Sequence, residues 1–100
     1  MPQFDVLRTK NPTYPLVVDV QADLHAKLAT RVVVPMVLRT RYAQPATRLT
    51  PVIEVRGNDY VLLFPQMAAV PKQALGAVVG SLAAERTVLI AALDLLITGS

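Results

Sequence analysis

The sequence predicts a mainly β protein with one C-terminal α-helix, arranged as an antiparallel β-barrel-like domain. Short β-rich runs separated by Pro, Gly and Asn fill most of the chain, whereas residues 82–98 contain neither Gly nor Pro. Several short strands followed by one closing helix are typical of such domains. A chain of 100 residues has room for a single core, so we expect one domain spanning residues 1–100.

Five segments predict β-strands because they are rich in β-branched and aromatic residues or alternate between apolar and polar side chains. These segments are residues 3–8, 16–20, 30–36, 52–56 and 60–64. The last two flank Gly57 and Asn58, a spacing that predicts a β-hairpin. Because Gly comes before Asn in this pair, a type II′ turn is favoured over a type I′ turn.

Proline-rich and polar segments predict the loops. Residues 10–15 contain two prolines and Asn11, and residues 39–51 are polar, contain Pro45 and lack periodicity. Residues 67–70, which a proline follows, are interpreted as core packing.

The C-terminal segment predicts the only helix. Ser81 is the predicted N-cap, residues 82–97 form the helix, and Gly99 stands where a left-handed C-cap residue belongs. The segment is apolar on most of its circumference. We therefore expect it to be buried on more than one side, against its own sheet and against a second subunit.

The composition supports a homodimer. Hydrophobic residues make up 53% of the chain and charged residues 17%, compared with about 25% charged residues in an average soluble domain. A small monomer cannot bury so much apolar surface, and a two-fold dimer is the simplest arrangement that does.

Several classes of protein are disfavoured. No apolar run approaches the ~20 residues of a membrane-spanning helix, and Asp5 stands where a secretory signal would be basic or apolar. The absence of cysteine is compatible with the cytoplasm, which is the expected location. The ten Lys and Arg residues give a net charge of +3 but are dispersed, which argues against direct binding of nucleic acid.

The sequence shows no catalytic, metal-binding or cofactor motif. It has a single histidine and no cysteine, and it lacks a P-loop, a dinucleotide-binding fingerprint and a nucleophile elbow. We therefore expect a protein that is not an enzyme and has no cofactor. Cleavage of RNA stays open as an alternative, because Arg, Asp and Thr side chains can perform it.

Two polar features have both a structural and a functional interpretation. Asp19, Gln21, Asp23 and His25 follow one another on one alternating face and form either a solvated strand end or a recognition surface. Asp94 lies in the last turns of the predicted helix, where a carboxylate opposes the macrodipole. Either it pairs with a nearby Arg or is solvated, or it meets a cationic group of a partner.

Five segments together resemble the CcdB family of toxins. In order along the chain they are residues 17–23 (VVDVQAD), 31–35 (RVVVP), 51–53 (PVI), 66–71 (QMAAVP) and 91–99 (AALDLLITG). The resemblance runs from Gln3 to the end of the chain. It implies an SH3-like barrel with a small extra sheet and a C-terminal helix, in a two-fold dimer.

The resemblance also implies a function without catalysis. CcdB toxins bind the A subunit of DNA gyrase and trap the enzyme on cleaved DNA. A CcdA-like antitoxin neutralises them. The toxins contact DNA only indirectly, through gyrase or through the autoregulatory complex with the antitoxin. The implied gyrase-binding residues are Leu24, His25, Asp94, Ile97, Thr98, Gly99 and Ser100, and the implied antitoxin-binding residues are Arg8, Lys10 and Tyr14.

Four of the implied gyrase-binding residues depart from the best-known family pattern. His25 replaces an aliphatic residue, Asp94 an asparagine, Thr98 an aromatic residue and Ser100 a terminal isoleucine. The alternatives to gyrase poisoning are an RNA-cleaving toxin of the MazF kind and a degenerate family member that binds antitoxin without poisoning gyrase.

Overall fold

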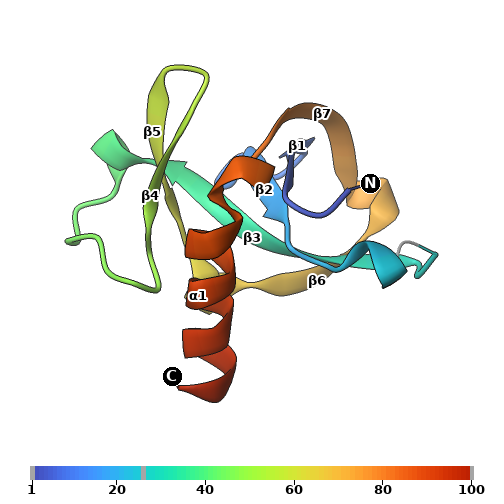
Figure 1. Cartoon of the computed structure of the whole chain (residues 1–100). Helices are drawn as coiled ribbons and strands as arrows, with labels where there is room; N and C mark the ends of the chain where they lie inside the picture. The colour runs from blue at the N-terminus through green and yellow to red at the C-terminus, as the bar shows by residue number, and fades with distance from the viewer. Residues whose placement is uncertain (1, 26, 100) are drawn as a thin grey trace.

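A computed structural model describes residues 2–25 and 27–99 of the protein. It shows one curled antiparallel sheet with a C-terminal helix lying across it (Figure 1). The predicted fold class, mainly β with one C-terminal helix, is confirmed. No helix in the described ranges combines the length and apolar character needed to cross a membrane.

The strands are β1 (Asp5–Thr9), β2 (Leu16–Asp19), β3 (Thr30–Leu38), β4 (Val52–Val55), β5 (Asn58–Leu62), β6 (Ala68–Pro71) and β7 (Leu75–Ser81). Their order in the sheet is β4-β5-β3-β2-β1-β7, and β6 branches from this path by pairing with the first half of β3. The five predicted strands correspond to β1 to β5, with ends that differ by at most two residues. The predicted loop between β3 and β4 contains only a 3₁₀ turn, η2 (Arg39–Arg41), and an isolated bridge.

The central strands are buried on both faces. Val6, Val18 and Val34 lie in one row across β1, β2 and β3 and face the main core, under the helix. Leu7 pairs with Val17 on the opposite face, where a smaller apolar cluster forms. Burial on two sides explains why the sequence shows continuous β-branched runs in these strands instead of strict alternation.

The β4–β5 hairpin has a different turn from the predicted one. Val55 pairs with Asn58, so the two central residues are Arg56 and Gly57. Both have positive φ, 53° and 84°, which is the requirement of a type I′ turn. The predicted type II′ turn centred on Gly57 and Asn58 is therefore wrong by one position. The right-handed twist of the paired strands favours the I′ geometry, although Arg56 must then adopt a left-handed conformation.

The helix, α1 (Arg86–Thr98), begins later than predicted. Ser81 is the last residue of β7, where it pairs with Asp5, and its hydroxyl accepts a hydrogen bond from the Ala83 amide. It therefore stabilises the turn after β7 and is not the helix N-cap. Gly99 is the left-handed C-cap, as predicted, with a φ of 79°.

Two strands were not predicted, and both contain residues that disfavour strands. β6 consists of two alanines, a valine and Pro71, and none of them is fully buried. The interpretation of residues 67–70 as core packing holds for Met67 and Val70, which are half-buried and pack against the two core clusters, but not for the exposed Ala68 and Ala69. β7 contains Gly76 and Gly80 and pairs with β1 through two register shifts. A Cβ atom on Gly76 would approach the carbonyl oxygen of Arg8 to 3.3 Å, so the glycine permits the close contact between the two strands.

Candidate functional site

The residues implied to bind gyrase lie in two places in the chain. Leu24 belongs to the 3₁₀ turn η1 (Asp23–His25) after β2 and is 88% exposed. Ile97, 69% exposed, lies with Thr98 and Gly99 at the C-terminal end of α1. Figure 1 shows that η1 and this end of α1 lie well apart within one chain. The side chain of His25 and all of Ser100 are outside the described residues.

The C-terminal end of α1 leaves a carboxylate without a cationic partner. The Thr98 hydroxyl donates to the Asp94 carbonyl oxygen at 2.6 Å, and the Gly99 amide donates to the Leu95 carbonyl oxygen at 3.1 Å. The last turn contains no basic residue, and Asp94 makes no ion pair within residues 2–25 and 27–99. Among these residues, Asp94 therefore does not pair with an Arg of its own chain. Its exposed carboxylate faces solvent.

The segment that leads to η1 is held by a buried ion pair. The Arg31 Nε atom lies 2.7 Å from Asp19 Oδ2, and neither side chain is exposed. The other Asp19 oxygen accepts the Gln21 amide, and Arg31 donates to the Gln21 carbonyl oxygen. Gln21 Oε1 accepts the Val32 amide at 2.9 Å. Asp19 thus belongs neither to a solvated strand end nor to a recognition surface, and both interpretations are wrong for this residue.

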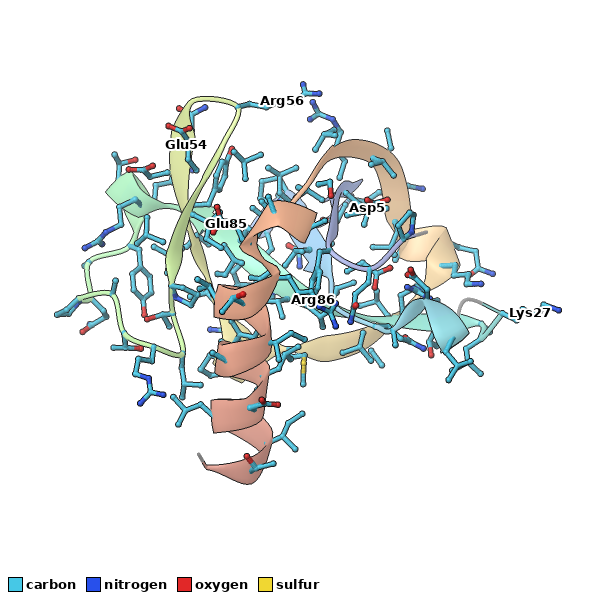
Figure 2. The ribbon with its side chains drawn as sticks, in the orientation of Figure 1. Asp5, Lys27, Glu54, Arg56, Glu85 and Arg86 are labelled. Atoms are coloured by element: carbon cyan, nitrogen blue, oxygen red, sulfur yellow. The ribbon has the colours of Figure 1, made fainter. Side chains whose placement is uncertain are left out.

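A second set of hydrogen bonds connects η1 to the start of α1. The Gln3 amide donates to Asp23, and the Gln3 side chain donates to the Val20 carbonyl oxygen at 3.1 Å. Arg86, the first residue of α1, donates to Gln3 Oε1 at 3.0 Å and lies 5.7 Å from the centre of the Phe4 ring. Figure 2 shows Arg86 turned from the helix toward β1. The N-terminal segment therefore links the turn that carries Leu24 to the helix that carries Ile97.

Asp5 lies close to the same carboxylates. Burial raises the pKa of its carboxyl group, and the negative charges of Asp19 and Asp23 raise it further. Only Asp19 of the three has a cation paired with it in the described part of the chain. Asp19 and Asp23 accept hydrogen bonds from backbone amides, and no group of His, Asp or Glu among the described residues could hold a metal ion.

The residues implied to bind antitoxin are brought together around Tyr14. Arg8 is exposed in β1, and Lys10 is exposed in the loop that follows. The Tyr14 hydroxyl lies 2.8 Å from Gln66 Oε1. Tyr14 and Arg8 line a cleft of about 620 Å³, while Tyr14 and Lys10 line a second, mostly apolar pocket of about 410 Å³.

A comparison with protein families connects this geometry to known proteins. The family model described as CcdB protein matches residues 3–99. The chain belongs to the CcdB family. It is thus a toxin of the CcdB type, and membership in the CcdB family implies partnering between toxin and antitoxin. No curated protein matches the chain.

Some residues around the CcdB-type sites were missed from the sequence. Arg31 stands at the start of an apolar run, and a cation beside buried valines could have suggested a buried acidic partner. Nothing in the local sequence indicates that Gln3 meets Arg86, because 83 positions separate them along the chain. Arg41 and Arg56 are also far from Arg8 in the sequence, yet all three line the same cleft.

Proposed function

We propose that this toxin binds the A subunit of DNA gyrase, traps the enzyme on cleaved DNA, and is neutralised by a CcdA-like antitoxin in the cytoplasm. The family match over residues 3–99 carries this proposal. Exposed apolar side chains at both implied gyrase-binding places, Leu24 and Ile97, support it. The protein acts by binding and not by catalysis.

We further propose that the active form is a homodimer built on α1. Only Leu89 and Ala92 of the helix are fully buried. A second apolar stripe on α1 is formed by Val88, Ala91 and Leu95, which are spaced three and four residues apart; Val88 and Ala91 are exposed and Leu95 is half-buried. A helix with apolar residues on both sides needs a second partner, and a copy of the same chain satisfies this requirement.

A charged residue in this stripe is expected to produce monomers. Val88 is 44% exposed, so Val88→Glu does not disturb the core but places a carboxylate in the proposed interface. Light scattering at micromolar concentration should give the mass of a dimer for the wild type and of a monomer for Val88→Glu. Leu28→Glu is the control, because Leu28 is 52% exposed and follows Lys27, which lies far from α1 in Figure 2, and it should remain dimeric. A monomeric wild type contradicts the proposal.

Asp94 can bind a gyrase arginine through its charge, in place of the aromatic ring that other family members use. Related toxins hold a gyrase arginine between two aromatic residues at the position of Thr98, and Thr cannot stack. In a two-fold dimer, two unpaired Asp94 carboxylates flank the same groove and can accept the arginine. The aromatic contact is worth ~0.5–2 kcal/mol, and a charge-assisted hydrogen bond is worth ~1.5–3 kcal/mol. The exchange therefore preserves binding but makes it more sensitive to salt.

Inhibition of purified gyrase supercoiling tests the proposed function. Wild type should inhibit and should produce linear DNA after protein digestion. Asp94→Asn keeps the shape and removes the charge, so it should inhibit less at low salt. It should also stabilise the fold by about 0.3–1 kcal/mol, because the unfavourable charge at the helix end is lost.

Three outcomes contradict parts of the proposal. Unchanged affinity of Asp94→Asn at low salt removes the arginine-pairing role. Absence of inhibition by the wild type removes gyrase as the target. Fragmentation of RNA without breakage of DNA, in cells that express the chain, would mean that the toxin cleaves RNA and does not poison gyrase.

A further inference from the structure

The turn that carries Leu24 is held in place by hydrogen bonds and not by packing. Leu24 is 88% exposed and belongs to neither apolar cluster of the core. Asp23, the first residue of η1, is also exposed, and its Oδ1 atom accepts the Gln3 amide. Because the Leu24 side chain has no packing partner in the core, its position depends on the bonds that hold Asp23.

Gln3 joins this turn to two other parts of the chain. Its backbone amide donates to Asp23, and its Nε2 atom donates to the Val20 carbonyl oxygen at 3.1 Å, directly after β2. Its Oε1 atom accepts from Arg86 Nη1 at 3.0 Å, in the first turn of α1. Figure 1 shows the N-terminal segment passing between η1 and the start of α1. One residue therefore sets the place of the turn relative to the helix.

Phe4 fixes the backbone beside Gln3. Its φ of 71° is unusual for a bulky residue, and its ring is buried in the main core. Its amide donates to the Asp19 carbonyl oxygen, while its carbonyl oxygen accepts the Leu82 amide at 2.8 Å. A backbone conformation of this kind persists only where the surrounding structure determines it, and it is frequent at binding sites. Gln3 is thus attached to a rigid point of the fold and not to a free chain end.

The guanidinium group of Arg86 is directed to the same segment. It donates to Gln3, and its Cζ atom lies 5.7 Å from the centre of the Phe4 ring, within the range of a cation–π contact. Arg86 makes no ion pair with any residue in the ranges 2–25 and 27–99. In this part of the chain its charge therefore does not stabilise the helix surface through a carboxylate, and its polar contact is with Gln3.

The two exposed apolar contacts are attached to the fold in different ways. Ile97 lies on α1, which Leu89 and Ala92 fix to the core, whereas Leu24 depends on the hydrogen bonds of Gln3. A partner that binds both places gains affinity when neither place has to be ordered on binding. The bonds of Gln3 therefore lower the cost of binding at the turn.

We infer that three residues form a positioning relay, which holds Leu24 in the place where the A subunit of gyrase binds it. They are Arg86, Gln3 and Asp23. They act on gyrase through Leu24 and need not touch it, and none of them is among the gyrase-binding residues that the family resemblance implies. The inference rests on the gyrase binding proposed above.

Two substitutions at Asp23 separate positioning from direct contact. Asp23→Ala removes the acceptor of the Gln3 amide and should weaken binding to the purified gyrase A subunit about tenfold, measured by titration calorimetry. Asp23→Asn keeps a side-chain oxygen at the same place but has no charge, so its affinity should stay within about twofold of the wild type. If Asp23→Asn is as harmful as Asp23→Ala, the charge of the carboxylate itself meets gyrase, and the relay is refuted.

A double-mutant cycle tests whether Arg86 acts through Leu24. Arg86→Met keeps an unbranched side chain but removes the donor, and it should weaken binding about fivefold in the wild type and in Ile97→Ala. In Leu24→Ala the same change should weaken binding less than about twofold, because the side chain that the relay positions is gone. Equal losses in all three backgrounds refute the relay.

Arg48→Met is the matched control for the charge. It removes one positive charge from the exposed loop between β3 and β4 and should leave the affinity for gyrase within about twofold of the wild type. A loss as large as that of Arg86→Met would assign the effect to net charge and would overturn the role of Arg86.

Order parameters from NMR relaxation test the relay without gyrase. The backbone amides of Asp23 and Leu24 should have values of about 0.85 in the wild type, typical of rigid backbone, and below about 0.6 in Asp23→Ala. Asp23→Asn should keep the values of the wild type, and urea denaturation verifies that every variant is folded. Unchanged order parameters in Asp23→Ala refute the relay.

These measurements distinguish the relay from the proposed target. If the wild type does not bind the gyrase A subunit while the order parameters fall as expected, gyrase is refuted and the relay stands as the device that orders η1. If the wild type binds gyrase but neither the order parameters nor the double-mutant cycle shows the expected change, the relay alone is refuted.

Discussion

Replacing Asp19 with Ala is expected to lower the free energy of unfolding by about 3–5 kcal/mol, because it leaves the Arg31 charge buried and unpaired. Both side chains have no exposed surface, and the carboxylate also accepts the Gln21 amide. Denaturation by urea, followed by circular dichroism at fixed protein concentration, measures the change. The loss is comparable to the whole stability of a marginal domain, so part of the population should be unfolded without denaturant.

Two controls identify the cause of this loss. Asp59→Ala removes an exposed carboxylate from β5 and should change the stability by no more than about 0.5 kcal/mol. Removing both partners, in Asp19→Leu/Arg31→Met, should be much less harmful than Asp19→Ala, since no buried charge remains. A loss below ~1 kcal/mol in Asp19→Ala would show that water or another cation reaches Arg31 when the carboxylate is absent.

The second large effect separates the two sides of α1. Leu89 is fully buried in the main core, and Leu89→Ala should cost about 2–5 kcal/mol of stability through lost burial and the cavity that remains. Ile97 is 69% exposed on the same helix, so Ile97→Ala should leave chemical denaturation within about 0.5 kcal/mol of the wild type. In the gyrase assay the order should reverse: Ile97→Ala should inhibit at least about tenfold less, while folded Leu89→Ala should inhibit normally.

This pair of variants needs only two measurements. Urea denaturation reports the fold, and supercoiling inhibition at a temperature where Leu89→Ala is folded reports the site. Normal inhibition by Ile97→Ala would mean that the exposed end of α1 is not the gyrase-binding surface. A stability loss in Ile97→Ala similar to that of Leu89→Ala would mean that its side chain is buried in the folded dimer.

Local patterns were sufficient for the elements whose sequence and environment agree. The strands β1 to β5 are rich in residues that favour strands and are bounded by turns. Gly99 ends the helix in the left-handed conformation that glycine favours. β6 and β7 were not predictable in this way, since Pro71 and the glycines of β7 are poor strand formers. Their strand structure comes from pairing with β3 and β1, and such tertiary pairing overrides the weak intrinsic preference of the residues.

The candidate sites were predicted through resemblance and not through local chemistry. Leu24 and Ile97 became candidates by position, and their exposure is consistent with a role in binding. Asp19 shows why a polar residue at a strand end cannot simply be assigned to the surface. Its partner Arg31 comes close to it only when β2 and β3 pair. The cleft lined by Arg8, Arg41 and Arg56 likewise requires the fold, because these arginines come from three separate parts of the chain.

The pairing of the first strand with the seventh has a consequence for how the toxin is made. Asp5 pairs with Ser81 and Val6 with Gly80, so β1 completes its hydrogen bonds only with residues near the end of the chain. Contacts so distant in sequence slow folding, because loop closure must precede the gain from pairing. During synthesis one edge of β1 stays unpaired until β7 leaves the ribosome, and such an edge is open to aggregation. We therefore expect a truncated or nascent toxin to be insoluble and inactive, and only the finished chain to require an antitoxin.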